Sequence, residues 1–237
     1  MQSKKVSVIL PTYNEKENIE ELIRQIYFYC KKDMFEIIVV DDNSPDGTSE
    51  IVRNLQKKHK SLRLYRRVNE RGLPSAICAG IEKAKGNIIV WFDCDLSHPP
   101  AIIPKLLEYI PQYDVVIASR YVKGGKDNRT FIRISASRFV DTLASFILRL
   151  GIKDVTSGFY VVKKEVFERI QLMKTGYAEY CIRFSYDLVK KRFKVKEIGY
   201  VFSDRTQGAS KTSPSLGRFL YNGYLCFREI LKLSVRK

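Results

Sequence analysis

Residues 87–98 read NIIVWFDCDLSH, an apolar run that ends in two carboxylates. The apolar part, 87–92, predicts a buried strand. Side chains alternate along an extended chain, so Asp93 and Asp95 are expected to point the same way where this strand ends. Two carboxylates placed like this suit Mg²⁺, which completes its shell with water and substrate phosphates. Since Asp-x-Asp triplets are also common by chance, a strand end with two solvated acids is the alternative.

The chain before this run repeats the arrangement of an apolar strand followed by polar residues. Two further strands are predicted at 6–10 and 35–40, and apolar residues at helical spacing predict a helix over 17–30. A second helix is expected to begin at Thr48, with that residue as its cap. Strands that alternate with helices form parallel sheets, whose ligands bind beyond the carboxyl ends of the strands. Three polar clusters should therefore meet at one edge of the sheet: 11–15, 41–44 and 93–95.

Six short motifs, taken together, resemble one protein family. They are PTYNE (11–15), VVDDNSPDGT (39–48), DCDLSHPP (93–100), ASRY (118–121), DVTSGF (154–159) and R-x-x-G-x-S-K (205–211). In this order they resemble the family 2 glycosyltransferases of the GT-A fold, and within them the dolichyl-phosphate mannose synthases and other polyprenyl-phosphate glycosyltransferases. The resemblance implies a single α/β domain over 1–237, with a mostly parallel, Rossmann-like sheet flanked by helices. Its first half, 1–118, would bind the nucleotide sugar, and its second half, 119–237, the acceptor.

The resemblance also implies a donor site. Pro11, Tyr13 and Glu15 are expected to line the nucleoside pocket. Asp41 is expected to accept hydrogen bonds from the base, since guanine and uracil both present N–H donors. Asp42 would hold the loop or the ribose, and the alternative for Asp42 is a turn cap.

A metal site at the diphosphate is implied in the same way. By the resemblance, Asp93 and Asp95 hold Mg²⁺ or Mn²⁺ against the diphosphate, and Asp95 counts among the catalytic residues. The third ligand position of the family is Ser97 in this chain. Because a hydroxyl is a weaker ligand than a carboxylate, water is the alternative at that position.

The acceptor implied by the resemblance is a polyprenyl phosphate. A phosphate monoester is already largely anionic at neutral pH and needs no general base. The Glu-Asp dipeptide that supplies such a base in relatives acting on hydroxyls is absent from this chain. By the resemblance, cationic and polar side chains hold the lipid phosphate (Arg120, Arg133 and Ser137) and a mobile basic loop neutralises the leaving diphosphate (Arg205 and Lys211). For all five, the alternative is a solvent-facing polar side chain.

Charge is distributed unevenly along the 237 residues. Residues 1–118 hold 17 Lys and Arg against 16 Asp and Glu, whereas 119–237 hold 25 against 10. A basic second half points to an anionic acceptor or an anionic surface, and a basic surface that only aids solubility is the alternative. No zinc spacing or aromatic RNA-binding motif indicates nucleic acid. A helix is expected over 177–191, with Glu179, Asp187 and the cations 190–192 on its exposed surface.

Membrane contact is expected to be peripheral. The sequence has no run of about 18 apolar residues, and no apolar signal segment precedes the first strand. Two amphipathic segments, 131–150 and 216–233, are candidates for interfacial helices, and the alternative for 131–150 is a helix packed on the sheet. Five cysteines without a CxxC pair indicate a reducing compartment. We therefore expect a cytoplasmic protein at the cytoplasmic face of a membrane, with or without a small membrane subunit.

The function that these expectations favour is an inverting, metal-dependent transfer of one sugar onto polyprenyl or dolichyl phosphate, with GDP-mannose as the first candidate donor. One alternative keeps the lipid acceptor and uses UDP-glucose or UDP-N-acetylglucosamine. Another is transfer to a hydroxyl of a polysaccharide or glycolipid. The non-enzymatic alternative is a catalytically idle, basic adaptor for membranes or RNA.

Overall fold

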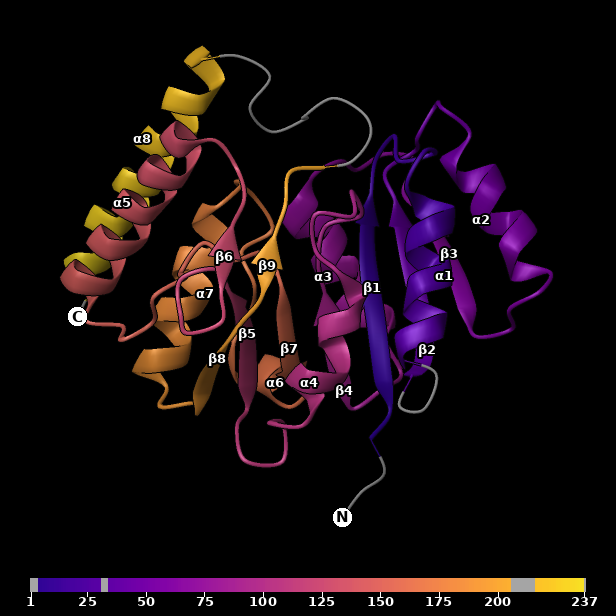
Figure 1. Cartoon of the computed structure of the whole chain (residues 1–237), viewed down its shortest axis with the longest axis horizontal. Coiled ribbons are helices and arrows are strands. Elements are labelled where there is room, and N and C mark those ends of the chain that lie inside the picture. The colour runs from indigo at the N-terminus through magenta and orange to yellow at the C-terminus, as the bar shows by residue number, and fades with distance from the viewer. Residues whose placement is uncertain (1–3, 31–33, 206–215, 237) are drawn as a thin grey trace.

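A seven-stranded sheet runs through both halves of the chain in the computed structural model, which describes residues 4–30, 34–205 and 216–236. Its strands are β1 (Val6–Thr12), β2 (Met34–Asp41), β3 (Leu62–Arg66), β4 (Ile88–Trp91), β5 (Val115–Ser119), β7 (Tyr160–Lys163) and β8 (Val195–Gly199). They lie in the order β3-β2-β1-β4-β7-β5-β8 (Figure 1). Within this sheet β7 runs antiparallel to β4 and β5, and the other pairs are parallel.

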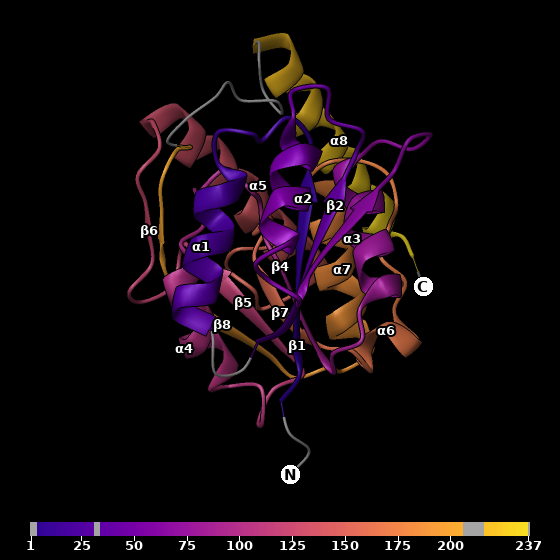
Figure 2. The same cartoon turned by 90° about the vertical axis from the view of Figure 1, so that its right-hand side faces the viewer.

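Helices cover both faces of the sheet, which explains why its strands read as continuous apolar runs. One face carries α1 (Ile19–Cys30), α2 (Thr48–Gln56), a 3₁₀ turn (Pro100–Ile102) and α4 (Ile103–Leu107), and the other carries α3 (Leu73–Lys83), α6 (Val166–Arg169) and α7 (Glu179–Lys190) (Figure 2). At the β8 end, α8 (Leu216–Ser234) packs against α5 (Phe131–Leu148) and α7 (Figure 1). A second, two-stranded sheet pairs β6 (Lys126–Asp127) with β9 (Val201–Phe202).

The strand order reverses between β1 and β4. From β1 the chain proceeds to β2 and β3 on one side, and β4 then returns to the other side of β1. Such a reversal leaves a crevice at the carboxyl ends of the two strands, where ligands of α/β sheets bind. The predicted α/β class, the parallel sheet and the position of the 11–15 and 93–95 clusters at this edge are confirmed.

The predicted cap of the second helix is wrong. Gly47, with φ of 96°, precedes α2, and the Thr48 hydroxyl instead donates to Asp46 at 2.6 Å. A left-handed backbone favours glycine, which has no Cβ to clash. The Asp46 carboxylate, rather than the Thr48 side chain, accepts the first helical N–H, that of Thr48, at 3.0 Å.

The predicted exposure of Glu179 is also wrong. Glu179 begins α7 and is buried, and its carboxylate accepts the backbone N–H of Tyr177 at 2.8 Å. A carboxylate at a helix N-terminus is stabilised by the unpaired N–H groups there, so this charge is satisfied by local backbone. Residues 190–192 are exposed, as predicted. In the described residues, no helix combines the length and the apolarity that crossing a bilayer requires.

Candidate functional site

The crevice between β1 and β4 brings together side chains that are far apart in the sequence. The Nη2 atom of Arg205 lies 3.1 Å from Asp95 Oδ2 and 3.3 Å from Glu15 Oε1. All three side chains are largely buried, so salt screens their attraction only weakly. The 41–44 cluster also reaches this edge, since the Ser44 hydroxyl accepts the N–H of Asn14 at 2.9 Å. The predicted meeting of the three polar clusters is confirmed.

Asp95 is held in its ionised form by its neighbours. Its Oδ1 atom accepts the backbone N–H of Ser97 at 3.1 Å and the Ser97 hydroxyl. Burial alone would raise the pKa of Asp95, but the Ser97 hydrogen bonds and the positive charge of Arg205 outweigh it and leave the pKa below its ordinary value. The Ser97 hydroxyl thus contacts the neighbouring carboxylate, and its role as a metal ligand stays a prediction.

Asp93 lies at the mouth of a cavity, with 39% of its side chain exposed. Its Oδ2 atom is 3.7 Å from Nε2 of His98, which is buried. The other ring nitrogen of His98 lies 3.0 Å from the hydroxyl of Tyr200, whose ring stacks on the imidazole. His98 therefore contacts Asp93, and Tyr200 holds the His98 ring in place. Neither was predicted in the site, because a histidine before two prolines reads as part of a turn.

The donor set at this edge fits a divalent cation whose shell is completed by substrate phosphate. Within the described residues, no group of three or more His, Cys, Asp or Glu side chains is arranged to hold a metal. Asp93 and Asp95 offer carboxylate oxygens, and the guanidinium of Arg205 against Asp95 shows that this position attracts positive charge. Mg²⁺ commonly takes only one or two protein carboxylates and keeps its remaining positions for water and phosphate.

The acid that ends β2 and the acid that follows it both bind the chain itself. Asp41 is fully buried, and its carboxylate accepts the N–H and hydroxyl of Ser44 and the hydroxyl of Ser49. Asp42 accepts Nε–H of Arg67 and the N–H of Gly72, each at 2.7 Å. Asp42 therefore holds a loop, as one of its predicted roles required. The contact of Asp41 with a base stays a prediction, since Ser44 and Ser49 already bind both oxygens of its carboxylate.

The other predicted nucleoside residues lie beside these acids. The Arg71 guanidinium lies 3.6 Å from the centre of the Tyr13 ring, a cation–π contact. Pro11 is buried and its carbonyl accepts the thiol of Cys94 at 3.3 Å. Tyr13 is half-buried, and Arg71 covers one face of its ring.

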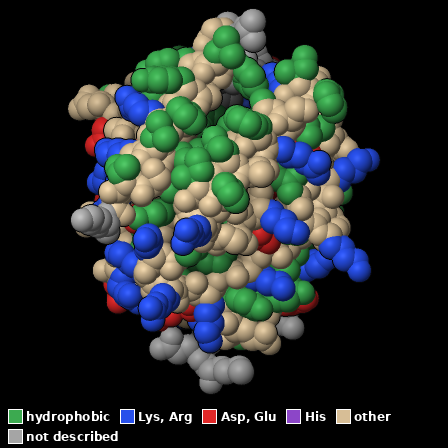
Figure 3. Space-filling view, turned by 90° about the vertical axis from the view of Figure 1, so that its left-hand side faces the viewer, with side chains coloured by type: hydrophobic (Ala, Val, Ile, Leu, Met, Phe, Trp, Pro, Cys, Tyr) green, Lys and Arg blue, Asp and Glu red, His purple; other side chains and the backbone are tan. Residues whose placement is uncertain are grey.

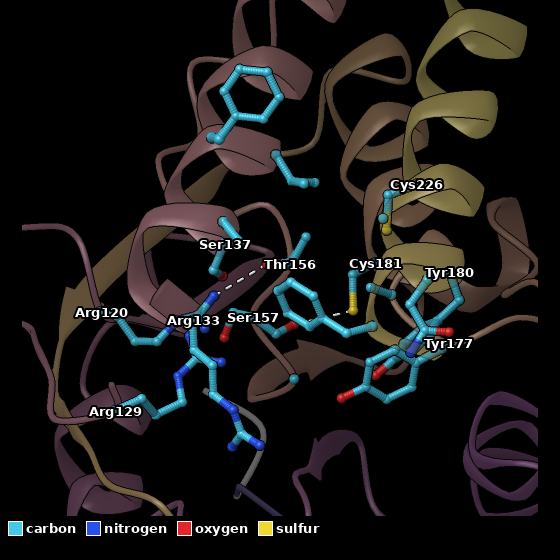
Figure 4. A pocket seen from close by; sticks show the side chains of 18 of the residues that line it. Arg120, Arg129, Arg133, Ser137, Thr156, Ser157, Tyr177, Tyr180, Cys181 and Cys226 are labelled. Carbon is cyan, nitrogen blue, oxygen red and sulfur yellow. Dashed lines mark hydrogen bonds between the residues drawn. The ribbon is translucent and has the colours of Figure 1, made fainter. Parts of the chain in front are cut away.

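A cavity of about 490 Å³ extends from Asp93 into the second half of the chain (Figure 4). Its polar end is lined by Arg120, Arg129, Arg133 and Ser137, which lie on one side of the cavity in Figure 4. Its apolar end runs between α5 and α8, and it is lined there by Phe139, Val140, Leu143, Phe219, Leu220, Phe227 and Ile230. The three residues predicted at the acceptor phosphate therefore share one cavity, which is amphipathic along its length.

Arg120 is the most strongly bound cation at the polar end. Its guanidinium donates to both oxygens of Asp154, with Nε 2.9 Å from Oδ2, and lies 3.6 Å from Asp141 and 3.9 Å from Asp127. Burial would lower the pKa of Arg120, but Asp154 and Asp141 raise it well above the ordinary value. Arg120 therefore ties α5 to the loop before β7 as well as lining the cavity.

The other two arginines face the cavity with fewer acidic neighbours. Arg133 is 38% exposed and lies 3.3 Å from Asp204, and Arg129 lies 2.6 Å from Asp127. Arg129 was not predicted in the site, because a single cation just before a helix carries no distinctive sequence pattern. Arg129 and Arg133 are both placed to meet an anion that enters beside Asp93.

Comparison with known proteins agrees with this geometry. The model of the family described as "Glycosyl transferase family 2" matches residues 7–171, which is more than half of the chain. The chain belongs to glycosyltransferase family 2. It is 43% identical over 212 residues to a dolichol-phosphate mannosyltransferase of Pyrococcus furiosus, covering 87% of this chain but 59% of that protein. It is 33% identical to a polyprenol monophosphomannose synthase of Mycolicibacterium smegmatis, covering 88% of this chain and 81% of that protein.

Solved structures confirm the fold of this family 2 chain. A glucosyl-3-phosphoglycerate synthase of Mycobacterium tuberculosis, in complex with Mn²⁺, UDP and glucosyl-3-phosphoglycerate, matches with a TM-score of 0.72 at 18% identity. The match covers 98% of this chain and 80% of that one. The same protein with Mg²⁺ and UDP matches with a TM-score of 0.73 at 16% identity. These proteins share the GT-A arrangement and carry a divalent cation with a nucleotide.

Lys211, predicted with Arg205 on a basic loop, lies outside the described residues of this family 2 chain. The described part of the predicted loop ends at Arg205. Arg205 was predicted at the leaving diphosphate, and its position between Glu15 and Asp95 agrees with a place at that edge.

Replacing Asp141 with asparagine is expected to remove a pH dependence of unfolding. Burial, reinforced by the charge of Asp154, raises the pKa of Asp141 to about 7 although Arg120 opposes the shift. Since the unfolded pKa is about 4, the folded state binds the extra proton between these values, and the free energy of unfolding should fall as pH rises through about 4 to 7. Urea unfolding at about pH 5 and about pH 8 should show a smaller difference in Asp141→Asn than in the wild type.

The matched control is Asp114→Asn, because the pKa of Asp114 is lowered: burial opposes that shift, and hydrogen bonds from Lys194 and Lys163 outweigh it. This control should keep the difference between the two pH values. An unchanged difference in Asp141→Asn would mean that the buried carboxyl does not titrate in this range.

Proposed function

We propose that this chain transfers a mannosyl residue from GDP-mannose to the phosphate of a polyprenyl or dolichyl lipid, with inversion at the anomeric carbon. One observation carries the proposal: a single cavity begins at Asp93, passes a cluster of arginines and continues between the apolar side chains of α5 and α8. A sugar diphosphate at the crevice and a lipid phosphate in this cavity would meet beside Asp93. The two relatives, one named for dolichol phosphate and one for polyprenol monophosphate, support a lipid acceptor and mannose.

In the proposed reaction, an oxygen of the lipid phosphate attacks C1 of the sugar while the bond from C1 to the diphosphate breaks, and GDP leaves. The nucleophile is already an anion, so no proton is removed by the protein. Asp93 and Asp95, with Ser97 or water, would hold Mg²⁺ or Mn²⁺, which when bound neutralises the diphosphate. Arg205 and Lys211 would add positive charge at the leaving group.

Substrate binding divides between the two halves of the chain. Residues at the ends of β1 and β2 would hold the nucleoside: Pro11, Tyr13, Glu15, Asp41 and Asp42. Residues at the polar end of the cavity would hold the lipid phosphate: Arg120, Arg133 and Ser137, joined by Arg129. Bidentate pairs already bind Arg120 to Asp154 and Arg129 to Asp127. Arg133, whose one acidic partner among the described residues is Asp204 at 3.3 Å, would therefore supply most of the charge that the phosphate meets.

The lipid acceptor would be reached at a membrane surface. Apolar side chains on the outer sides of α5 and α8 form an exposed surface, which we call the α5–α8 apolar face: Phe131, Ile132, Phe139, Phe146, Leu220, Tyr224, Phe227 and Leu231. Figure 3 shows hydrophobic side chains gathered on this side of the molecule, with Lys and Arg around them. An apolar face bordered by cations is typical of contact with an anionic membrane. The proposed location is the cytoplasmic face of such a membrane.

Binding to vesicles is expected to require anionic lipid and to weaken as salt is raised. The cations of the second half attract an anionic surface, and their attraction falls off within a Debye length of about 10 Å at 0.1 M salt. Co-sedimentation with phosphatidylcholine vesicles, with and without phosphatidylglycerol, measures both effects. If vesicle binding does not change with salt concentration, the contact depends on the α5–α8 apolar face and not on the cations.

The test of the proposed activity is transfer of radiolabelled sugar into organic-extractable lipid. GDP-mannose, UDP-glucose and UDP-N-acetylglucosamine are supplied separately, with polyprenyl phosphate and Mn²⁺. If only GDP-mannose labels the lipid, the proposal is supported. If only a UDP-sugar labels the lipid, that UDP-sugar is the donor in place of GDP-mannose. No label with any donor, although calorimetry shows nucleotide binding, would direct the search to hydroxyl acceptors or to a missing membrane subunit.

A further inference from the structure

A second hollow lies against α5, separate from the cavity that reaches Asp93. Six of its lining residues matter here: Tyr121, Arg138, Asp141, Phe146, Arg149 and Lys153. Arg138 and Phe146 lie on α5, Arg149 ends that helix with φ of 54°, and Lys153 lies in the segment that follows. Three cations, one from the middle of α5, one from its C-terminal cap and one from the segment that follows, thus surround one depression.

These cations are not neutralised by acidic partners. In the part of the chain that the structure describes, neither Arg138, Arg149 nor Lys153 makes a salt bridge within 4.0 Å. Arg138 lies 5.0 Å from the centre of the Tyr121 ring, and Arg120 lies 4.8 Å from the same ring. Arg149 also faces the negative end of the α5 dipole, which accounts for one cation but not for three.

The one acid in the hollow is directed away from it. Asp141 is 1% exposed, its Oδ1 accepts the N–H of Thr156 at 2.7 Å, and its Oδ2 lies 3.6 Å from Arg120. Asp141 thus forms the floor between the hollow and the acceptor cavity. An anion in the hollow would meet the three cations first.

The hollow borders the α5–α8 apolar face. On α5, Phe139 and Phe146 are seven residues apart and share one strip, and both are more than half exposed. Arg138 lies about 100° round the helix from Phe139, and Phe146 lines the hollow itself. If the apolar face enters a bilayer, the hollow comes to lie at the level of the lipid phosphates.

We infer that this hollow binds the phosphate of an anionic membrane phospholipid, at a site distinct from the acceptor site. Guanidinium groups bind phosphate through paired N–H donors, and their stems can lie along apolar surface while the charge reaches the interface. Such a contact would set the orientation of the bound protein relative to the membrane surface, so that the acceptor cavity faces the lipid. The inference rests on the membrane contact proposed above but not on the sugar or on the transfer reaction.

The test compares two triple variants of equal charge change. R138Q/R149Q/K153Q removes the hollow's cations, and K57Q/K58Q/K60Q removes three exposed lysines near the end of α2, on the opposite side of the molecule (Figure 1). Each cation near an anionic surface changes binding about fivefold, so the loss of three should weaken binding of the hollow variant to phosphatidylglycerol vesicles by about 100-fold relative to wild type. The control variant should lose much less, and R138K/R149K, which keeps the charge, should recover most of the binding.

The outcomes separate the inference from the proposed function. Weak vesicle binding by the hollow variant, with unchanged transfer to a short polyprenyl phosphate in detergent, supports the inference. Equal losses in both triple variants mean that only total charge matters and overturn it, as does unchanged binding. Calorimetry with glycerol phosphate, in the absence of vesicles, tests whether the hollow binds a soluble phosphate. If wild type binds glycerol phosphate and the hollow variant does not, the hollow is a site for a soluble anion and not for a membrane lipid. Loss of transfer in detergent would place these residues in the acceptor site.

Discussion

Replacing Asp95 with asparagine is expected to lower kcat for sugar transfer by about 10³-fold. Asparagine keeps the size of the side chain and can still accept the N–H of Ser97 through its amide oxygen. It loses the negative charge that would hold a divalent cation against the diphosphate and that Arg205 contacts at 3.1 Å. The measurement is steady-state transfer from GDP-mannose at saturating Mn²⁺, with donor affinity followed separately by calorimetry.

Asp114→Asn is the matched control for this change. Asp114 precedes β5 at the opposite edge of the sheet and pairs with Lys163 at 3.0 Å, so its loss alters stability without touching the crevice. Transfer by Asp114→Asn should stay within about threefold of wild type, since the substitution leaves transition-state contacts intact. Equal kcat values for Asp95→Asn and wild type would show that transfer does not depend on the charge of Asp95. Unchanged donor binding with no turnover in either protein would favour a binding role for the chain.

Replacing Arg205 with alanine is expected to lower kcat by about 10²-fold with a smaller change in the dissociation constant of the donor. A cation at the leaving diphosphate stabilises charge that develops as the sugar departs, so its loss acts on the transition state. The structure adds a second expectation. Because Arg205 occupies Asp95 Oδ2 at 3.1 Å, it competes with a divalent cation for that oxygen, and Arg205→Ala should bind Mn²⁺ more tightly in the absence of donor.

Arg205→Lys separates charge from geometry. Lysine keeps the positive charge but has a shorter side chain than arginine, whose Nη2 atom donates to both Glu15 and Asp95, so Arg205→Lys should recover part of kcat. Parallel losses in kcat and donor affinity in Arg205→Ala would mean that Arg205 only binds the donor. If Arg205→Ala binds Mn²⁺ more tightly but its kcat does not fall, Arg205 only competes with the cation for the carboxylates and does not stabilise the leaving group.

The first strands and the polar edge could be predicted because their signals are local. Each strand is a short apolar run followed directly by polar residues, as at 87–95, and the run between two strands carries helical spacing. Parallel strands all end on the same side of the sheet, so polar residues that follow each strand in the sequence are expected to lie together at that edge. The cap at Thr48 and the exposure of Glu179 failed because each depends on a turn or a packing surface that local composition does not reveal.

The cavity around Arg120 could not be predicted in the same way. The family resemblance predicted Arg120 at the acceptor phosphate, but its bidentate partner Asp154 lies 34 residues away and Asp141 approaches from α5. Arg129 and the cations of the second hollow were not predicted in a site, because isolated cations on or beside a helix carry no distinctive spacing. His98 was not, because a histidine before two prolines is more typical of a turn than of a site.

By itself, the sequence determined the class of fold, the edge of the sheet that holds the site and the family to which the chain belongs. These follow from apolar periodicity and from the order of motifs, which are properties of short segments. Only the tertiary structure decided which charges meet: Arg205 with Glu15, 190 residues apart, and Arg120 with its buried acids. The physical reason is that the strength of a charge pair depends on distance and on exclusion of water, and both are set by packing between elements rather than by the chain near each residue.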